Sequence, residues 1–157
     1  MTTTAIIPLS PPVNLRDLAG IPISGGEVIL EGFAIRADDL SIITEDAAEG
    51  LVGQGLRAVI DLRSPAEFGV TGRGPLGAMS SVTYHNVPLL DGIEPDPDDL
   101  ASYADQSRFG SLYRRMFENE PRQIVSCLAI IAYTPGAVAF HCAAGQDRTG
   151  VLAAALL

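Results

Sequence analysis

Apolar residues in this chain gather in short runs, each about as long as one strand. The runs at 58–62 and 84–90 are typical of strands, and the run at 137–140 is typical of a strand buried on both faces. Residues 21–35 carry β-type side chains around a Ser-Gly-Gly triplet at 24–26. This pattern predicts a hairpin with the glycines at its turn.

The stretches between these runs have the pattern of helices. A threonine and two acidic residues begin the segment 44–54, which is typical of a capped helix start. Apolar side chains at helical spacing predict a helix over 98–118, and a proline in the first turn predicts another over 121–133. The last run, 151–157, is also predicted to be helical, whereas no regular structure is predicted for the glycine-rich segment 69–81.

The composition is that of one globular domain covering residues 1–157. Of the 157 residues, 47% are hydrophobic and 18% are charged, which suffices to bury a substantial core. Because strands alternate with helices, we predict an α/β fold whose central, mainly parallel sheet is flanked by helices. The formal net charge of −9 argues against a nucleic-acid partner, since such binding needs clustered Lys and Arg.

The sequence shows neither a conventional signal peptide nor a membrane-spanning run. Cys127 lies in the apolar run 124–131 and is predicted to be a core thiol. Cys142, in the segment 141–150, is a candidate nucleophile and must stay reduced to react. We therefore expect a cytoplasmic protein without stable membrane insertion. Secretion without a conventional signal peptide stays open.

The segment from His141 to Gly150, HCAAGQDRTG, combines a strand end, a turn of small residues and a helix start. A helix start directs unpaired N–H groups and the positive end of its dipole into the preceding turn, which favours an anion. Cys142 stands at the mouth of this turn and Arg148 follows six positions later, so thiol and guanidinium can face one bound phosphate. Because the same field favours thiolate, we predict that Cys142 is a nucleophile aimed at phosphorus.

The other residues of this loop have predicted supporting roles. Arg148 grips two phosphate oxygens, and Asp147 is the carboxylate that can protonate the leaving oxygen or position a water. His141 is expected to orient the loop, and Thr149 to donate its hydroxyl to the sulfur. No metal or other cofactor is required. The predicted phosphate-binding residues are Ala143, Ala144, Gly145, Gln146, Asp147 and Arg148.

The pattern His-Cys-x5-Arg-Thr-Gly at 141–150 resembles the active-site loop of cysteine-dependent protein tyrosine phosphatases. Its Asp-Arg-Thr-Gly ending, with NLRDLAG at 14–20 and DLRSPAEF at 61–68, is similar to the bacterial tyrosine phosphatases of the secreted mycobacterial type. The resemblance spans nearly the whole chain and implies a protein tyrosine phosphatase-like fold. It also implies a cysteinyl-phosphate intermediate and activity on phosphotyrosine, with phosphoserine, phosphothreonine and phosphoinositides as further substrates.

Two features of the sequence depart from that family, and the general acid has two candidates. Gln146 stands where the family usually has lysine, which weakens the expectation of activity on phosphoinositides. Family members continue beyond the position of Leu157, so we expect the domain to be incomplete at its C-terminal end. Many tyrosine phosphatases carry their general acid on a loop upstream of the cysteine, which makes Asp91 a rival to Asp147.

The two remaining matches have alternative interpretations. Arg16 and Asp17 are expected to brace a loop at a sheet edge, and the resemblance implies that their segment frames the active site. Arg63 follows a strand end, where ligands of α/β sheets gather, so it either contacts substrate or forms a bracing ion pair with Glu67. The spacing from Asp61 to Glu67 is also similar to rhodaneses. A rhodanese-type sulfurtransferase and a non-catalytic phosphoprotein-binding module are therefore alternative functions.

Overall fold

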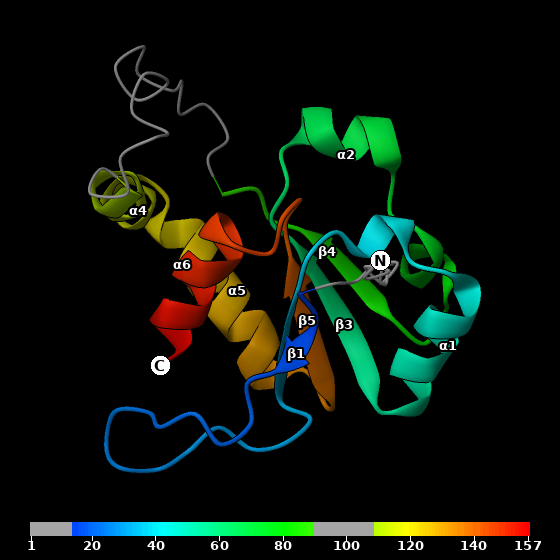
Figure 1. Ribbon diagram of the computed structural model, residues 1–157, viewed down its shortest axis with the longest axis horizontal. Helices are drawn as coiled ribbons and strands as arrows, with labels where there is room; N and C mark the ends of the chain where they lie inside the picture. Colours follow the sequence, from blue (N-terminus) through cyan, green and yellow to red (C-terminus); the bar gives the residue numbers. More distant parts are fainter. Residues whose placement is uncertain (1–13, 90–108) are drawn as a thin grey trace, which may run out of the picture.

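The structure is a computed structural model, and it describes residues 14–89 and 109–157. In these residues five strands form one sheet in the order β1-β2-β5-β3-β4 (Figure 1). Only β1 runs antiparallel to its neighbour, and the other pairs are parallel, which confirms the predicted α/β class with a mainly parallel sheet. The strands are β1 (Arg16–Asp17), β2 (Ala34–Ala37), β3 (Leu56–Asp61), β4 (Thr83–Asn86) and β5 (Ala137–His141).

Helices cover both faces of this sheet. One face carries α4 (Phe109–Asn119), α5 (Pro121–Tyr133) and α6 (Asp147–Leu156). The other carries α1 (Glu45–Gly53) and two short 3-10 helices, η1 (Leu40–Ile42) and η2 (Pro75–Ala78), while α2 (Pro65–Thr71) follows the end of β3. In the described ranges, no helix combines the length and the apolar character needed to cross a bilayer.

The central strand β5 is buried on both faces, as its apolar run predicts. Val138 and Phe140 join the core cluster beneath α5 and α6, whereas Ala137 and Ala139 join the cluster beneath α1. Each cluster gains apolar burial from alternate residues of one strand. The consequence is that Cys142, the next residue after the strand, is held at the carboxyl edge of a rigid sheet.

Three sequence predictions need correction or restriction. Residues 69–81 contain the end of α2 and all of η2, because a Ser64–Glu67 capping box starts a helix that tolerates Gly69. The predicted hairpin with glycines at its turn is present but short: across Gly25 and Gly26 the amide of Ile23 donates to the carbonyl of Glu27 and that of Ile29 to the carbonyl of Ile21, whereas β2 begins only at residue 34 and pairs with β5. Of the predicted helix 98–118, residues 109 onward are helical and the rest lies outside the described residues.

Candidate active site

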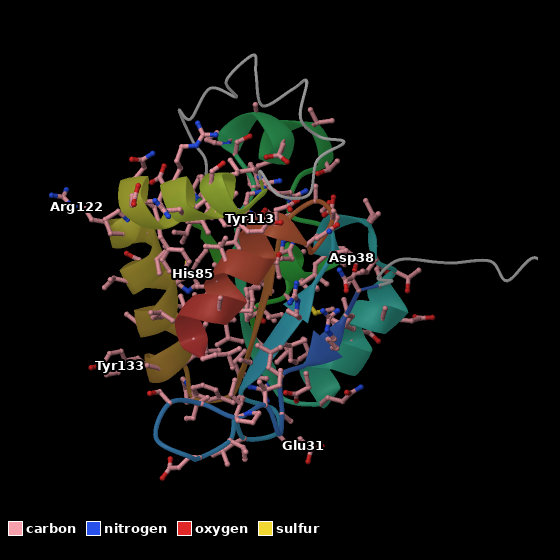
Figure 2. The ribbon with its side chains drawn as sticks, turned by 60° about the vertical axis from the view of Figure 1, so that its left-hand side comes forward. Glu31, Asp38, His85, Tyr113, Arg122 and Tyr133 are labelled. Atoms are coloured by element: carbon pink, nitrogen blue, oxygen red, sulfur yellow. The ribbon has the colours of Figure 1, made fainter. Side chains whose placement is uncertain are left out.

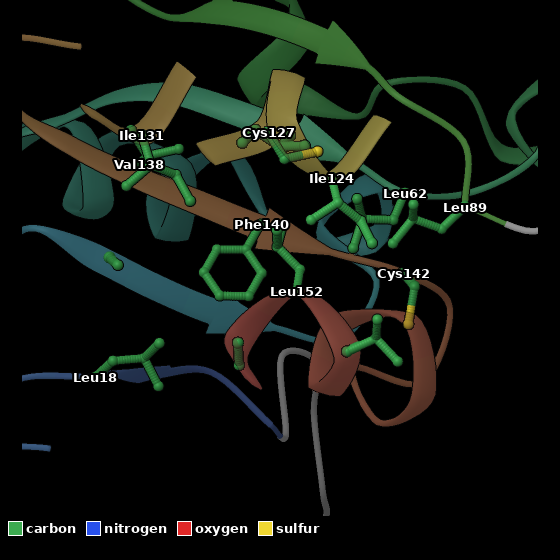
Figure 3. Close-up of a cluster of buried hydrophobic side chains, with 14 of the residues drawn as sticks. Leu18, Leu62, Leu89, Ile124, Cys127, Ile131, Val138, Phe140, Cys142 and Leu152 are labelled. Atoms are coloured by element: carbon green, nitrogen blue, oxygen red, sulfur yellow. The ribbon is translucent and has the colours of Figure 1, made fainter. Parts of the chain in front are cut away.

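Cys142 lies on the floor of the loop between β5 and α6. The residue is only 2% exposed, and Figure 3 shows its sulfur pointing into the curve formed by the loop and the start of α6. Ala143, Ala144 and Gln146 are exposed above it. The sequence places this thiol at the mouth of the loop; the structure corrects that position, because Cys142 directly follows the buried strand β5 and is itself buried. A nucleophile in this position has to be reached through the loop.

The sulfur has a polar neighbour in the first turn of α6. Thr149 Oγ1 lies 3.2 Å from Cys142 Sγ, with Thr149 itself fully buried. A hydroxyl at this distance can donate a hydrogen bond to sulfur, and a negatively charged sulfur accepts it most strongly. The contact supports the role expected for Thr149.

Two side chains from outside the loop hold its carbonyl groups. Asn14 Nδ2 donates to the carbonyls of Ala144 (3.2 Å) and Gly145 (3.0 Å), and Arg36 Nη2 donates to that of Gly145 (2.7 Å). In a planar trans peptide the N–H points opposite the C=O. The N–H groups of Gly145 and Gln146 therefore point away from these donors. Together with the unpaired amides that begin α6, they can face an anion.

Gly145 is required by both its conformation and its surroundings. Its φ is +66°, in the left-handed region that side chains disfavour. A Cβ atom here would lie 2.5 Å from the carbonyl oxygen of Ala37 and 2.6 Å from the amide nitrogen of Asp38. Any larger residue would push the loop away from β2 and disturb the amides on its other side.

Arg148 is oriented by a carboxylate on α2. Its Nη1 and Nη2 donate to the two carboxylate oxygens of Glu67 at 2.7 and 2.8 Å, and Nη1 also reaches the carbonyl of Leu62 at 3.4 Å. Hydrogen bonding from Arg148 is the main reason that the pKa of Glu67 falls to about 2. A guanidinium has five N–H groups, and these contacts use three. The Nε–H and the second Nη2–H form a parallel fork that suits phosphate oxygens. Burial lowers the pKa of Arg148, but interactions with Glu67 and with the Cys142 sulfur, hydrogen bonds among them, outweigh it and raise that pKa.

Arg63 is buried, connects several elements of the structure and is not available to a substrate. It is 1% exposed, and it forms ion pairs with Asp61 (2.7 Å) and Asp39 (3.1 Å). Further hydrogen bonds reach Thr71, the last residue of α2, and the carbonyl of Gly72 directly after it. The suggested Arg63–Glu67 pair is therefore wrong, because each partner pairs elsewhere. Arg63 instead ties the end of β3 to η1 and α2, and thereby supports the helix that presents Glu67.

His141 lies behind the loop in the same buried network. Its Nδ1 is 3.4 Å from the amide of Leu40 and 3.3 Å from the carbonyl of Cys142, and its Nε2 is 3.7 Å from Asp61 Oδ1. Burial lowers the pKa of His141 although Asp61 opposes the shift, so the ring is neutral at pH 7. These backbone contacts agree with a loop-orienting role. The ring is fully buried and faces Asp61.

Asp147 begins α6 and contacts α4. Tyr113 Oη donates a hydrogen bond of 2.6 Å to Asp147 Oδ1. Both residues line a cavity of about 220 Å³ between α4 and α6, which Gln146 and Gly150 border as well. The rival acid, Asp91, lies outside the described residues, so the structure gives geometry for Asp147 alone.

Three residues that shape the site were not assigned these roles from the sequence. Arg36 supports the loop, Glu67 orients Arg148, and Tyr113 holds Asp147. Asn14 and Asp17 do occupy the framing segment, and Asp17 braces the chain by accepting from the amides of Ala19 and Gly32. The sequence does point to Glu67, because this residue lies in the segment 61–68, which resembles the same phosphatase family as the segment 141–150.

Comparison with known proteins agrees with this geometry. A family model described as "Tyrosine phosphatase family" matches residues 7–157. A Cupriavidus necator protein with the name "Putative tyrosine-protein phosphatase" is 30% identical over 162 residues, covering 92% of this chain and 54% of the relative. A tyrosine-protein phosphatase of Nostoc commune is 28% identical over 125 residues, covering 78% of this chain and 42% of the relative. The chain thus spans about half the length of these curated relatives.

Proposed function

The chain belongs to the tyrosine phosphatase family, and on that premise we propose that it hydrolyses phosphotyrosine in proteins through a cysteinyl-phosphate intermediate. The observation that carries the proposal is the pairing of Cys142 with a pre-oriented Arg148 around one small loop. Glu67 fixes the guanidinium at 2.7 and 2.8 Å, so a phosphoryl group that enters meets a fork already in place.

The first step transfers the phosphoryl group to the enzyme. The sulfur of Cys142 forms a bond to phosphorus as the bond from phosphorus to the tyrosine oxygen breaks. Asp147 gives its proton to that oxygen, and the phenol leaves. Arg148 and the loop amides stabilise the charge on the three equatorial oxygens.

The second step restores the enzyme. A water molecule attacks phosphorus, Asp147 takes one of its protons, and the phosphorus–sulfur bond breaks. Inorganic phosphate leaves, and the electron pair returns to the sulfur of Cys142. The Thr149 hydroxyl, 3.2 Å away, stabilises this leaving sulfur.

Both cysteines in the structure are free thiols, which suits the reducing, cytoplasmic setting that we propose. Phosphotyrosine is the first substrate to examine. Phosphoserine, phosphothreonine and phosphoinositides follow from the family resemblance and need direct comparison, because Gln146 leaves the exposed rim of the loop without lysine.

Rapid acid quenching during turnover of a phosphotyrosine peptide tests the proposal. Mass spectrometry of the digested protein should find phosphate on the peptide that contains Cys142, and none in Cys142→Ser. Turnover without that adduct would contradict the mechanism. Sulfur transfer from thiosulfate to cyanide without phosphate release would favour the sulfurtransferase alternative, and phosphopeptide binding without release would favour a binding module.

A further inference from the structure

Tyr113 on α4 donates a hydrogen bond to one of the two carboxylate oxygens of Asp147. The Tyr113 Oη to Asp147 Oδ1 distance is 2.6 Å, which is short for a hydrogen bond and typical of a charged acceptor. The two residues lie 34 positions apart, so this contact depends on the packing of α4 against α6. Figure 2 shows Tyr113 on α4 where this helix meets α6.

The donor in this pair is fixed. Burial and the adjacent Asp147 carboxylate raise the pKa of Tyr113 to about 12, so its hydroxyl keeps its proton throughout the physiological range. A permanent donor on Oδ1 restrains the rotation of the Asp147 carboxylate. Proton exchange with a substrate is then left to Oδ2.

The surroundings strengthen this contact. The cavity beside the pair is walled by Phe117, Val151 and Ala154, so it is largely apolar at this end. A hydrogen bond next to low-dielectric surface is stronger than one in water. On these two helices Arg148 is already paired with Glu67, and α4 also carries Arg114, Arg115 and Glu118.

We propose that Tyr113 is a positioning residue that anchors Asp147 by Oδ1 and aims Oδ2 at the leaving-group oxygen. This inference rests on the proposed function, because it assigns the orientation of that site's acid. The anchoring serves both half-reactions, since the same oxygen gives a proton in the first and takes one in the second.

The test uses two substrates that differ in how much they need the acid. Phenyl phosphate has a poor leaving group and depends on protonation, whereas 2,4-dinitrophenyl phosphate leaves with little help. In Tyr113→Phe we expect kcat/KM for phenyl phosphate to fall about tenfold, a fraction of the full general-acid effect. The value for the dinitrophenyl ester should stay within about twofold.

Tyr133→Phe is the matched control, since Tyr133 is 88% exposed on α5 and should behave as wild type. Equal losses on both substrates in Tyr113→Phe would mean a merely structural role and would overturn the inference, as would no loss on either. An alkaline limb that persists in Asp147→Asn would also overturn it, by placing the acid elsewhere. In each of these outcomes the wild-type protein still releases phosphate, whereas a wild type without turnover would instead refute the proposed function.

Discussion

The chain has two cysteines, both free and both buried, and their surroundings differ in every other respect. Cys127 lies on α5, fully buried between Ile124 and Ile131 in the larger core cluster. Removal from water raises the pKa of its thiol to about 12. Cys142 is nearly as buried, at 2% exposure, yet it has a threonine hydroxyl 3.2 Å from its sulfur and lies at the start of the loop that ends at Arg148.

The difference shows that burial by itself does not decide what a thiol can do. Apolar neighbours offer nothing to a negative sulfur, so Cys127 behaves as a small core residue. Cys142 instead has a hydroxyl donor from α6 and arginines from α6 and β2 around it. Arg36 illustrates this: burial and Arg16 lower its pKa, whereas the charge of Cys142 opposes the shift.

Serine replacements provide the strongest test of this comparison. We expect Cys142→Ser to lower turnover of p-nitrophenyl phosphate by at least about a thousandfold, the scale on which other enzymes lose a nucleophile. Cys127→Ser should keep the wild-type rate and lose only stability, because it buries a hydroxyl among apolar groups. Steady-state rates and thermal melts measure the two effects. A loss of rate in both variants would remove the distinction.

Alkylation compares the two thiols within one molecule. At pH 7.5 we expect iodoacetamide to modify Cys142 at least about a hundredfold faster than Cys127, because the thiolate is the reacting species. The pKa of about 12 leaves Cys127 almost wholly protonated. Peptide mass spectrometry over time gives both rates, and inorganic phosphate should slow the first. Faster labelling of Cys127 would contradict the assignment.

The distinction between the two cysteines could be predicted from the sequence because both settings are local. Cys127 lies in an unbroken apolar run, and Cys142 follows a strand and precedes small residues and a helix start. The same locality explains why α1 and α5 were predicted closely, with Thr44 capping the first and Pro121 beginning the second.

The partners that complete the site could not be predicted in this way. Glu67 lies 81 positions from Arg148, and Asp39 lies 24 positions from Arg63. Which of several carboxylates meets which arginine is decided when β3, η1 and α6 come together, and nothing in the local pattern encodes it. The burial of Cys142 could not be predicted from the local sequence either, because helices packed on both faces of the sheet determine it.

Removing the carboxylate behind Arg148 should have the next largest effect. We expect Glu67→Gln to lower kcat/KM about thirtyfold and to weaken phosphate binding, since the guanidinium loses its fixed orientation. Glu49→Gln, on the exposed surface of α1, removes the same charge and should change neither quantity. Phosphate inhibition constants and rates measured together provide the comparison.

The same variant has a pH signature. The folded-state pKa of Glu67 is about 2, below its ordinary 4.5, so its contribution to stability is full above about 4.5 and disappears as pH falls towards 2. Over that interval the unfolding free energy of wild type should fall more steeply than that of Glu67→Gln. The difference will be small because the Glu67 side chain is 37% exposed. Parallel slopes would mean that the ion pair is absent in solution.

Removing the Thr149 hydroxyl beside Cys142 should have the smallest of these effects. It makes the surroundings of Cys142 more like the apolar surroundings of Cys127. Thr149→Val keeps the volume of a fully buried side chain but removes the donor 3.2 Å from the sulfur, while Thr149→Ser keeps the donor. We expect Thr149→Val to lower kcat about fivefold, which corresponds to about 1 kcal/mol, the typical net contribution of one hydrogen bond. The loss should fall on hydrolysis of the phosphoenzyme, where the sulfur leaves, so a burst of phenol should precede slow turnover. Near-wild-type kinetics in Thr149→Ser complete the comparison, and a valine variant without the burst would show that the sulfur leaves unaided.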